Sequence, residues 1–164
     1  MSEEDQALSE ALQSRMGDTS TLMESVPMPD SIADCGDSPG YERMLCLIEL
    51  LKADVSEDNL ERLQLAYSRT EAEYWSTLPA GAFPKRPGVL LGELTTEQRG
   101  LVKAIMMEAT SQEADEGFDE MIQTLNADDY INTVSTDYKA GYSSFNTKFA
   151  FLGTPGSSGI RELY

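Results

Sequence analysis

The stretch that decides the fold is residues 94–109, which read LTTEQRGLVKAIMMEA. Thr95 stands where an N-cap residue belongs, and Gln98 follows three residues later. This is the capping-box pattern, which satisfies backbone amides that the first turn of a helix leaves free. Leu101 and Ile105 then recur at helical spacing among further apolar residues. The stretch therefore predicts a capped helix with one buried face that ends near residue 108.

Three further helices are predicted on either side of this stretch. An apolar face over residues 41–53 indicates a largely buried helix. Ser56 is a good N-cap for the next helix, whose apolar stripe continues at helical spacing as far as Trp75. A last amphipathic helix is predicted from about Gln112 to Leu125. About four helices therefore precede the C-terminal part of the chain.

Extended structure is predicted in the C-terminal part. After Asp129 the pattern changes, and residues 142–152 alternate between apolar and polar in the manner of a half-buried strand. The glycine-rich residues 153–159 indicate a turn, and residues 160–164 begin a second strand. Two strands alone are only marginally stable. The predicted fold class is therefore α+β, with about four helices followed by an antiparallel β-hairpin that belongs to a larger sheet.

Two regions of the chain differ in composition. Residues 1–40 are acidic, contain few large apolar side chains and carry prolines in their second half, so we expect a disordered tail there. Residues 41–164 are expected to form the helical front and first strands of a single α+β domain, since one domain commonly takes ~100–200 residues. The sequence stops at Tyr164 within an apparent strand, and we expect the domain to continue in a longer form.

Charge and composition exclude several functions. The 164 residues carry 29 Asp and Glu against 12 Lys and Arg, which gives a net charge of −17. No histidine occurs, and this excludes Ser-His-Asp and Cys-His catalysis as well as zinc sites with His ligands. The negative charge, without a run of Lys or Arg, argues against nucleic-acid binding. The same charge suggests a basic protein surface as the partner, or adaptation to high salt.

The termini and the cysteines bear on location. The N-terminus has neither the basic nor the apolar region of a secretory signal, and no apolar stretch approaches the ~20 residues that span a bilayer. We therefore expect a cytoplasmic protein that does not enter a membrane. Cys35 and Cys46 lie 11 residues apart, which fits neither a zinc site nor a redox pair. We expect Cys46 in the core and Cys35 in a loop, without a disulfide, because disulfides persist in oxidising compartments.

Two adjacent cations are candidate ligand-binding residues. Lys85 and Arg86 lie in residues 78–88, a loop that its prolines and glycines keep irregular. In a very acidic chain such a pair is a candidate for binding a carboxylate or phosphate ligand. The alternative is that both cations pair with surface acids such as Glu71 or Glu73.

No metal ligand is assigned from the sequence. Asp and Glu can serve as acid, base or metal ligand without histidine, and Asp128, Asp129 and Asp137 are the best-placed acids in what we expect to be loops. Their spacing does not match an EF-hand, and acids in loops commonly stabilise turns. The sequence therefore implies no cofactor for this chain.

Several short motifs occur in an order that resembles one uncharacterised family. They are Trp75, Leu78-Pro79, Arg86-Pro87-Gly88-Val89, Leu94-Thr95-Thr96-Glu97-Gln98-Arg99 and Phe149-Ala150-Phe151-Leu152-Gly153-Thr154-Pro155. Their order and spacing resemble the family catalogued as domain of unknown function thirty-five hundred, over residues 41–164.

This resemblance implies a function for a longer form of the chain. In that family a Gly-His-His motif follows, and it would fall beyond Tyr164. Paired histidines bind metals or act as acid and base, so the resemblance implies a metal-dependent enzyme that uses a divalent metal in a longer form. Arg99 matches the family's Gln-Arg pair and is a third candidate for ligand binding; the alternative is a helix-surface Arg paired with nearby acids.

Two functions stay open on the sequence. One is that the chain is the N-terminal part of such an enzyme domain and is inactive alone. The other belongs to a different class, an acidic interaction module that binds a basic protein partner. The substrate, the reaction and the partner are not readable from the residues.

Overall fold

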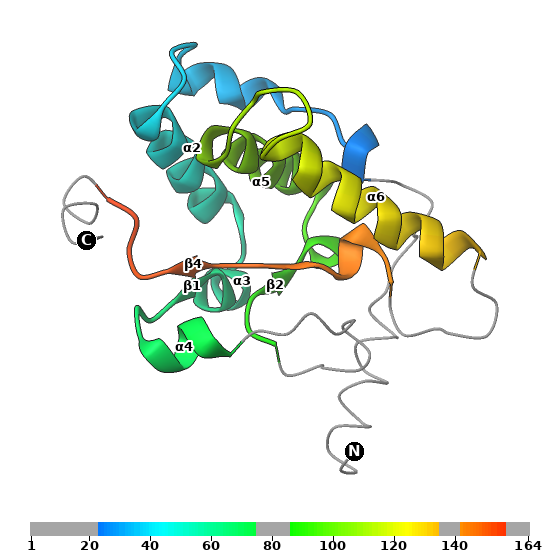
Figure 1. The fold of residues 1–164 in the computed structure, drawn as a ribbon. Helices are drawn as coiled ribbons and strands as arrows, with labels where there is room; N and C mark the ends of the chain where they lie inside the picture. The colour runs from blue at the N-terminus through cyan, green and yellow to red at the C-terminus, as the bar shows by residue number, and fades with distance from the viewer. Residues whose placement is uncertain (1–22, 75–85, 135–141, 157–164) are drawn as a thin grey trace.

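Two long helices form the centre of the molecule. The computed structural model describes residues 23–74, 86–134 and 142–156, and Figure 1 shows their arrangement. Helices α2 (Tyr41–Asp54) and α5 (Thr96–Ala109) pack against each other. Their facing sides are buried and apolar, as the helical spacing of the sequence predicted. Both predicted helices are confirmed.

The predicted capping box is present at the start of α5. The Thr95 side chain accepts a hydrogen bond from the Gln98 amide (3.2 Å), and the Gln98 side-chain oxygen accepts one from the Thr95 amide (3.0 Å). The Gln98 side chain also donates to the Asp54 carbonyl at the end of α2 (2.9 Å). Because Gln98 is buried, these bonds leave no unsatisfied amide there and fix the two helices to each other.

The helix predicted from Ser56 begins correctly and ends early. Helix α3 (Glu57–Leu63) is capped by the Ser56 side chain, but it gives way to strand β1 (Gln64–Leu65) and the short helix α4 (Arg69–Glu73). A single helix as far as Trp75 is therefore wrong, and Trp75 itself lies outside the described residues. The helix ends because the backbone of β1 pairs with a distant strand near the C-terminus.

The last helix is displaced along the sequence from its prediction. Helix α6 (Phe118–Val134) begins six residues later than Gln112 and continues well past Leu125. It begins late because Gly117 has a φ of 52°, and a Cβ there would lie 2.5 Å from the Ser111 carbonyl oxygen. The loop before α6 therefore requires glycine at this position.

The C-terminal segment contributes to two small sheets. Strand β3 (Lys148–Phe149) pairs antiparallel with β2 (Val89–Leu90), and β4 (Phe151–Leu152) pairs in parallel with β1. In Figure 1 this orange-to-red segment passes between the α2–α5 pair and helices α3 and α4. The α+β class is confirmed.

The predicted hairpin has a different form in the described residues. The strand expected over 142–152 is short, and its front part is the 3-10 helix η4 (Ser144–Asn146). Both of its strands pair with earlier segments of the chain. The second strand expected over residues 160–164 lies outside the described residues.

Residues 23–40 pack against the helical core. They form two 3-10 helices, η1 (Met23–Ser25) and η2 (Asp30–Cys35). The side chains of Met23 and Val26 are buried in the core cluster. In Figure 1 η1 lies beside α6. This part of the chain is structured because its few apolar side chains are the ones that reach the core.

The contact between this segment and α5 is close. A Cβ on Gly100 would lie 2.5 Å from the Pro27 carbonyl oxygen and 2.7 Å from Pro29 Cδ, so only glycine fits there. The expectation of a disordered tail is therefore wrong for residues 23–40. Residues 1–22 lie outside the described part of the chain.

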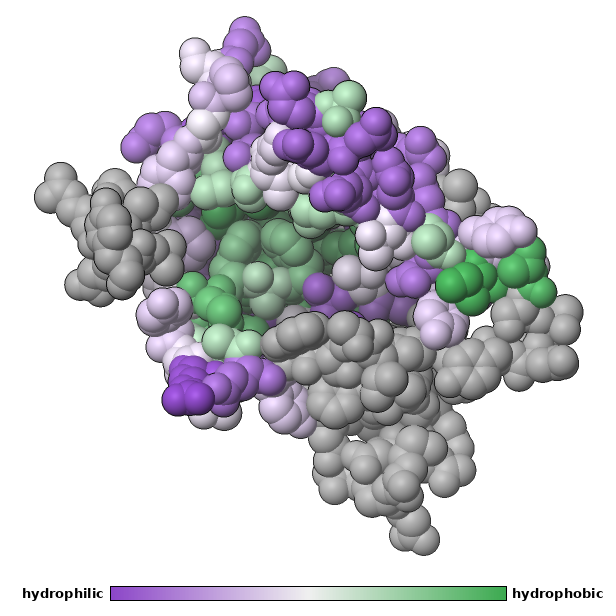
Figure 2. Space-filling view, in the orientation of Figure 1, coloured by the Kyte–Doolittle hydropathy of each residue, from purple (hydrophilic) through white to green (hydrophobic). Residues whose placement is uncertain are grey.

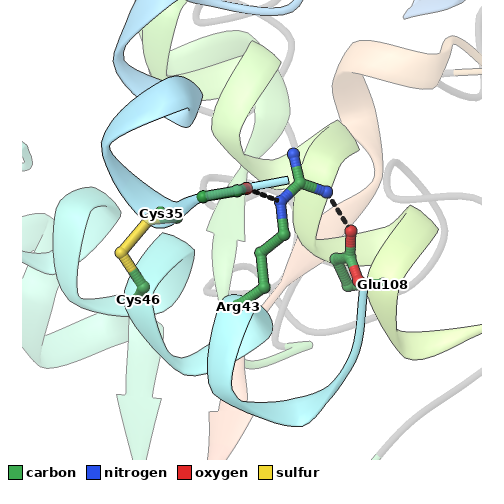
Figure 3. The surroundings of a disulfide bond; sticks show 5 residues. Cys35, Arg43, Cys46 and Glu108 are labelled. Atoms are coloured by element: carbon green, nitrogen blue, oxygen red, sulfur yellow. Dashed lines mark hydrogen bonds and ion pairs between the residues drawn. A yellow bond between two sulfur atoms is a disulfide. The ribbon is translucent and has the colours of Figure 1, made fainter. Parts of the chain in front are cut away.

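A disulfide joins Cys35 to Cys46, contrary to the sequence expectation. Helix η2 packs beside α2 and brings the two Cα atoms to 5.6 Å, which is within the range that a disulfide spans. The spacing of the cysteines gave no sign of this, because the approach depends on how η2 folds back. Figure 3 shows the bond beside the first turns of α2.

Among the helices of residues 23–74, 86–134 and 142–156, none is both long enough and apolar enough to cross a membrane.

Candidate functional site

An apolar cavity of about 560 Å³ is the candidate site. It opens between helices α2 and α5 on one side and the C-terminal segment 149–156 on the other. In Figure 2 it is the hollow lined by hydrophobic residues near the centre of the view. Its main lining residues are Met44, Ile48, Ile105, Met121, Phe149 and Phe151.

Helical spacing sets the inner wall of the cavity. Tyr41, Met44 and Ile48 follow one another at intervals of three and four along α2, so one face of that helix looks into the cavity. Ile105 and Ala109 do the same on α5. The wall is thus the continuation of the face that α2 and α5 bury between them.

The C-terminal segment closes the opposite side of the cavity. Phe149 and Phe151 pack edge to face with their ring centroids 5.2 Å apart. Gly153 then turns the chain with a φ of 82°, and its amide donates to the Leu65 carbonyl (2.8 Å). A Cβ at Gly153 would lie 3.2 Å from Tyr67 Cβ, so the turn packs closely on the β1–α4 loop.

Three polar side chains of the cavity wall are bonded to the protein itself. The Tyr41 hydroxyl donates to the Gly156 carbonyl (2.7 Å), and the Thr110 hydroxyl donates to the Met106 carbonyl (2.7 Å). The Thr154 hydroxyl accepts a hydrogen bond from the Gln64 side chain (3.2 Å). Because these groups are already satisfied, the cavity favours an apolar occupant over a charged one.

A run of acidic residues borders the cavity. Thr110 and Met121 both line it, and the chain between them carries acidic side chains that are exposed to solvent: Glu113, Asp115, Glu116, Asp119 and Glu120. In Figure 2 hydrophilic residues gather along the edge of the hollow. We call residues 113–120 the acidic rim.

The basic residues of the described ranges do not neutralise this rim. Each Lys and Arg there interacts with another carboxylate or with a backbone carbonyl of the chain. Within the ranges that the structure describes, no ion pair joins any of them to the acidic rim. Among the described residues, the rim therefore presents a negative charge that no ion pair with Lys or Arg compensates, beside an apolar opening.

Of the predicted pair Lys85 and Arg86, Arg86 does not line the cavity. Lys85 lies outside the described residues. Burial lowers the pKa of the Arg86 guanidinium, and the nearby Asp128 carboxylate opposes that shift. The predicted alternative partner Glu73 instead pairs with Arg69 (2.5 Å).

Arg99 has a structural environment that the sequence did not reveal. Its guanidinium donates to the carbonyls of Leu94 (2.6 Å) and Leu91 (3.2 Å), and it lies 4.4 Å from the centroid of the Phe145 ring. Burial lowers its pKa. The expected pairing with acids is wrong, because carbonyl oxygens and an aromatic face take their place.

The acids considered for a carboxylate-only centre belong to helix α6. Asp129 is buried and accepts hydrogen bonds from the Ser144 amide (2.8 Å) and the Ser143 hydroxyl (3.3 Å). Burial raises the pKa of Asp128, with a further increase from the Asp129 charge. Asp137 lies outside the described residues. The expectation of a loop is therefore wrong for the first two acids, and Asp129 holds η4 in place.

Within residues 23–74, 86–134 and 142–156, no group of three or more His, Cys, Asp and Glu side chains is placed to hold a metal ion.

The comparison with protein families gives one match. The model of the family described as Protein of unknown function (DUF3500) matches residues 38–161, which are 124 of the 164 residues. The chain belongs to this family. The DUF3500 match contains every residue that lines the cavity, whereas η1 and η2 precede it. No curated protein and no solved structure matches the chain.

Sequence reasoning missed the cavity as a site. Met44 and Ile48 were interpreted as core positions, and their apolar spacing is the same whether a helix faces a core or a cavity. One signal was available in the sequence. The dense acids of residues 113–120 directly precede Met121, so a charged segment stands beside an apolar position.

Proposed function

We propose that this domain is a binding module for a positively charged protein segment that inserts apolar side chains into the cavity. The observation that carries the proposal is the open apolar cavity beside the acidic rim. Its volume of about 560 Å³ lies within the range of ~300–1,000 Å³ that is usual for binding sites.

The two features have separate roles in recognition. Burial of apolar side chains in the cavity supplies affinity, because little polar surface there needs to be desolvated. The acidic rim and the net charge of −17 attract Lys and Arg on the partner and repel acidic competitors. The occupant that fits both is a segment with apolar residues on one face and basic residues beside them.

A designed peptide tests this proposal. The probe is a short helical peptide with Leu on one face and Lys on the other, titrated at physiological salt by calorimetry. Ala109→Trp fills part of the cavity from an exposed position on α5 and should weaken binding about tenfold or more, where tenfold corresponds to ~1.4 kcal/mol. Ala53→Trp is the matched control, since Ala53 is an exposed residue of α2 that does not line the cavity.

Two further peptides separate the contributions of shape and charge. Replacing Leu by Ser should abolish binding, and replacing Lys by Glu should do the same. Equal affinity of the parent protein and Ala109→Trp would refute the proposal. So would binding in low salt that survives the loss of Leu but disappears at about 150 mM salt, where the Debye length is near 8 Å, because nonspecific attraction alone behaves in that way.

Catalysis with a divalent metal stays a proposal for a longer form of this domain. The described side chains contain no suitable ligand group, and the sequence has no histidine. Ligands for such a centre would have to come from other residues. The geometry of the described residues therefore supports binding better than catalysis.

A further inference from the structure

The disulfide closes a loop that contains part of the cavity wall. Tyr41 and Met44 both line the cavity, and both lie between Cys35 and Cys46 in the sequence. The same short loop thus carries the disulfide and two of the side chains that shape the cavity.

The loop is fastened to α5 at a second place. Arg43 forms an ion pair with Glu108, and its Nε donates to the Gly36 carbonyl (2.8 Å). The Gly40 amide donates to the other carboxylate oxygen of Glu108 (2.9 Å). Figure 3 shows the disulfide on one side of the Arg43 side chain and Glu108 on the other. The start of α2 is thus held by a covalent bond on one side and by a polar cluster on the other.

Besides these contacts, the first turn of α2 is held by the Tyr41 hydroxyl, which donates to the Gly156 carbonyl (2.7 Å), and by the packing of Met44 on the core. The N-cap residue of α2 is Gly40, which provides no side chain to bond the free amides of the first turn. The first turn contains Tyr41 and Met44. Without the disulfide, fraying of this turn would move both side chains out of the cavity wall.

We propose that the Cys35–Cys46 disulfide controls the binding cavity, with the oxidised form competent to bind and the reduced form impaired. One thiolate of a dithiol reductant attacks a cysteine sulfur, breaks the Cys35–Cys46 bond and forms a mixed disulfide with that cysteine. The second thiolate of the reductant then attacks the reductant sulfur of the mixed disulfide and releases the cysteine thiolate. Two electrons and two protons pass to the cysteine pair, and the reductant leaves as its own disulfide. Cys35 and Cys46 are only half-buried, so a dithiol can reach them.

Such control would make binding at the cavity depend on the redox conditions of the compartment. In the cytoplasmic location expected from the sequence, glutathione and thioredoxin favour the dithiol, whereas an oxidising compartment favours the disulfide. The domain would bind its partner in the second environment and release it in the first. The biological meaning of the control rests on the proposed binding function, but the coupling of disulfide and cavity can be measured separately.

The test measures cavity occupancy with a small neutral probe, N-phenylnaphthylamine, whose fluorescence rises in apolar surroundings. Oxidised protein should bind it, and Ala109→Trp should not. Reduction by dithiothreitol, verified as a mass gain of two hydrogens, should weaken binding about tenfold if the competent population falls to about one tenth. Cys35→Ser/Cys46→Ser should bind as weakly as the reduced protein and should not respond to dithiothreitol.

Circular dichroism on the same samples separates local control from unfolding. The helical signal should persist on reduction, since α3, α5 and α6 lie outside the disulfide loop. Equal probe affinity in the two redox states would overturn the inference, and so would complete loss of helix on reduction. A redox-dependent probe signal combined with failure of the Leu/Lys peptide would refute only the proposed partner.

Discussion

The substitution Gly100→Ala tests how residues 23–40 pack on α5, because two opposing effects meet at this position. Gly100 lies in the interior of a helix, where alanine is favoured over glycine by about 1 kcal/mol. The new methyl group would lie 2.5 Å from the Pro27 carbonyl oxygen and 2.7 Å from Pro29 Cδ. Neither neighbour is the flexible end of a side chain, so the clash should cost about 2–3 kcal/mol, the upper part of the range for overpacking.

The net expectation is a loss of about 1–2 kcal/mol in the free energy of unfolding, since the clash exceeds the gain in helix propensity. Urea unfolding followed by circular dichroism measures it. Gly156→Ala is the control, because a Cβ there meets only the Thr154 carbonyl oxygen at 3.9 Å and stability should change by less than about 0.5 kcal/mol. A Gly100→Ala variant more stable than the parent would refute the packing of Pro27 and Pro29 on α5.

Three further predictions concern individual side chains. Cys35→Ser/Cys46→Ser should lower the free energy of unfolding by about 3 kcal/mol, from the chain entropy of a loop with a sequence separation of 11, and urea titration against the oxidised parent measures it. Arg99→Met should destabilise by about 1–3 kcal/mol, because charged hydrogen bonds and a cation–π contact are lost, yet leave peptide affinity unchanged in the calorimeter. The pKa of Asp128 is raised in the folded state, so the contribution of this group to stability falls as the pH rises above its usual pKa of 3.8. Asp128→Asn should therefore be more stable than the parent at pH 7. Thermal scans should show that this advantage disappears near pH 3.

Local signals were sufficient to predict the central helices. The capping box of Thr95 and Gln98 and the apolar spacing of α2 each involve residues only three or four positions apart, so both patterns are recognisable in the sequence. The same holds for the Ser56 cap, which starts α3 where expected. The α+β class followed from the change of pattern after these helices.

Features that depend on distant partners were not predictable. Strand β1 exists because its backbone pairs with Phe151 and Leu152, and nothing in its own two residues shows this. Helix α6 continues past Leu125, where the charged Asp129 occupies a core-facing position and so interrupts the apolar pattern. Its carboxylate accepts a hydrogen bond from the Ser144 amide, which lies 15 residues further along the chain. The disulfide likewise requires η2 to fold back on α2.

The candidate site was only half visible for a related reason. Apolar residues at helical spacing indicate a helix face that avoids solvent, but the spacing is the same for a packed core and for a cavity wall. Met44 and Ile48 therefore carried no sign of a cavity. For Arg99 the error is the opposite, since a residue with structural partners was interpreted as a candidate for ligand binding. A cation in an acidic chain suggested a ligand or an ion pair, yet its partners are two carbonyls and the Phe145 ring, which come together only in the folded chain.

The most direct test of the binding proposal follows methionine methyl groups by NMR during titration with the Leu/Lys peptide. Met44, Met106 and Met121 line the cavity, whereas Met23 is fully buried elsewhere in the core and serves as an internal reference. We predict shifts and intermolecular contacts at the three lining methyl groups, with Met23 unchanged. Saturating peptide that leaves all three lining methyl groups unshifted would contradict the account.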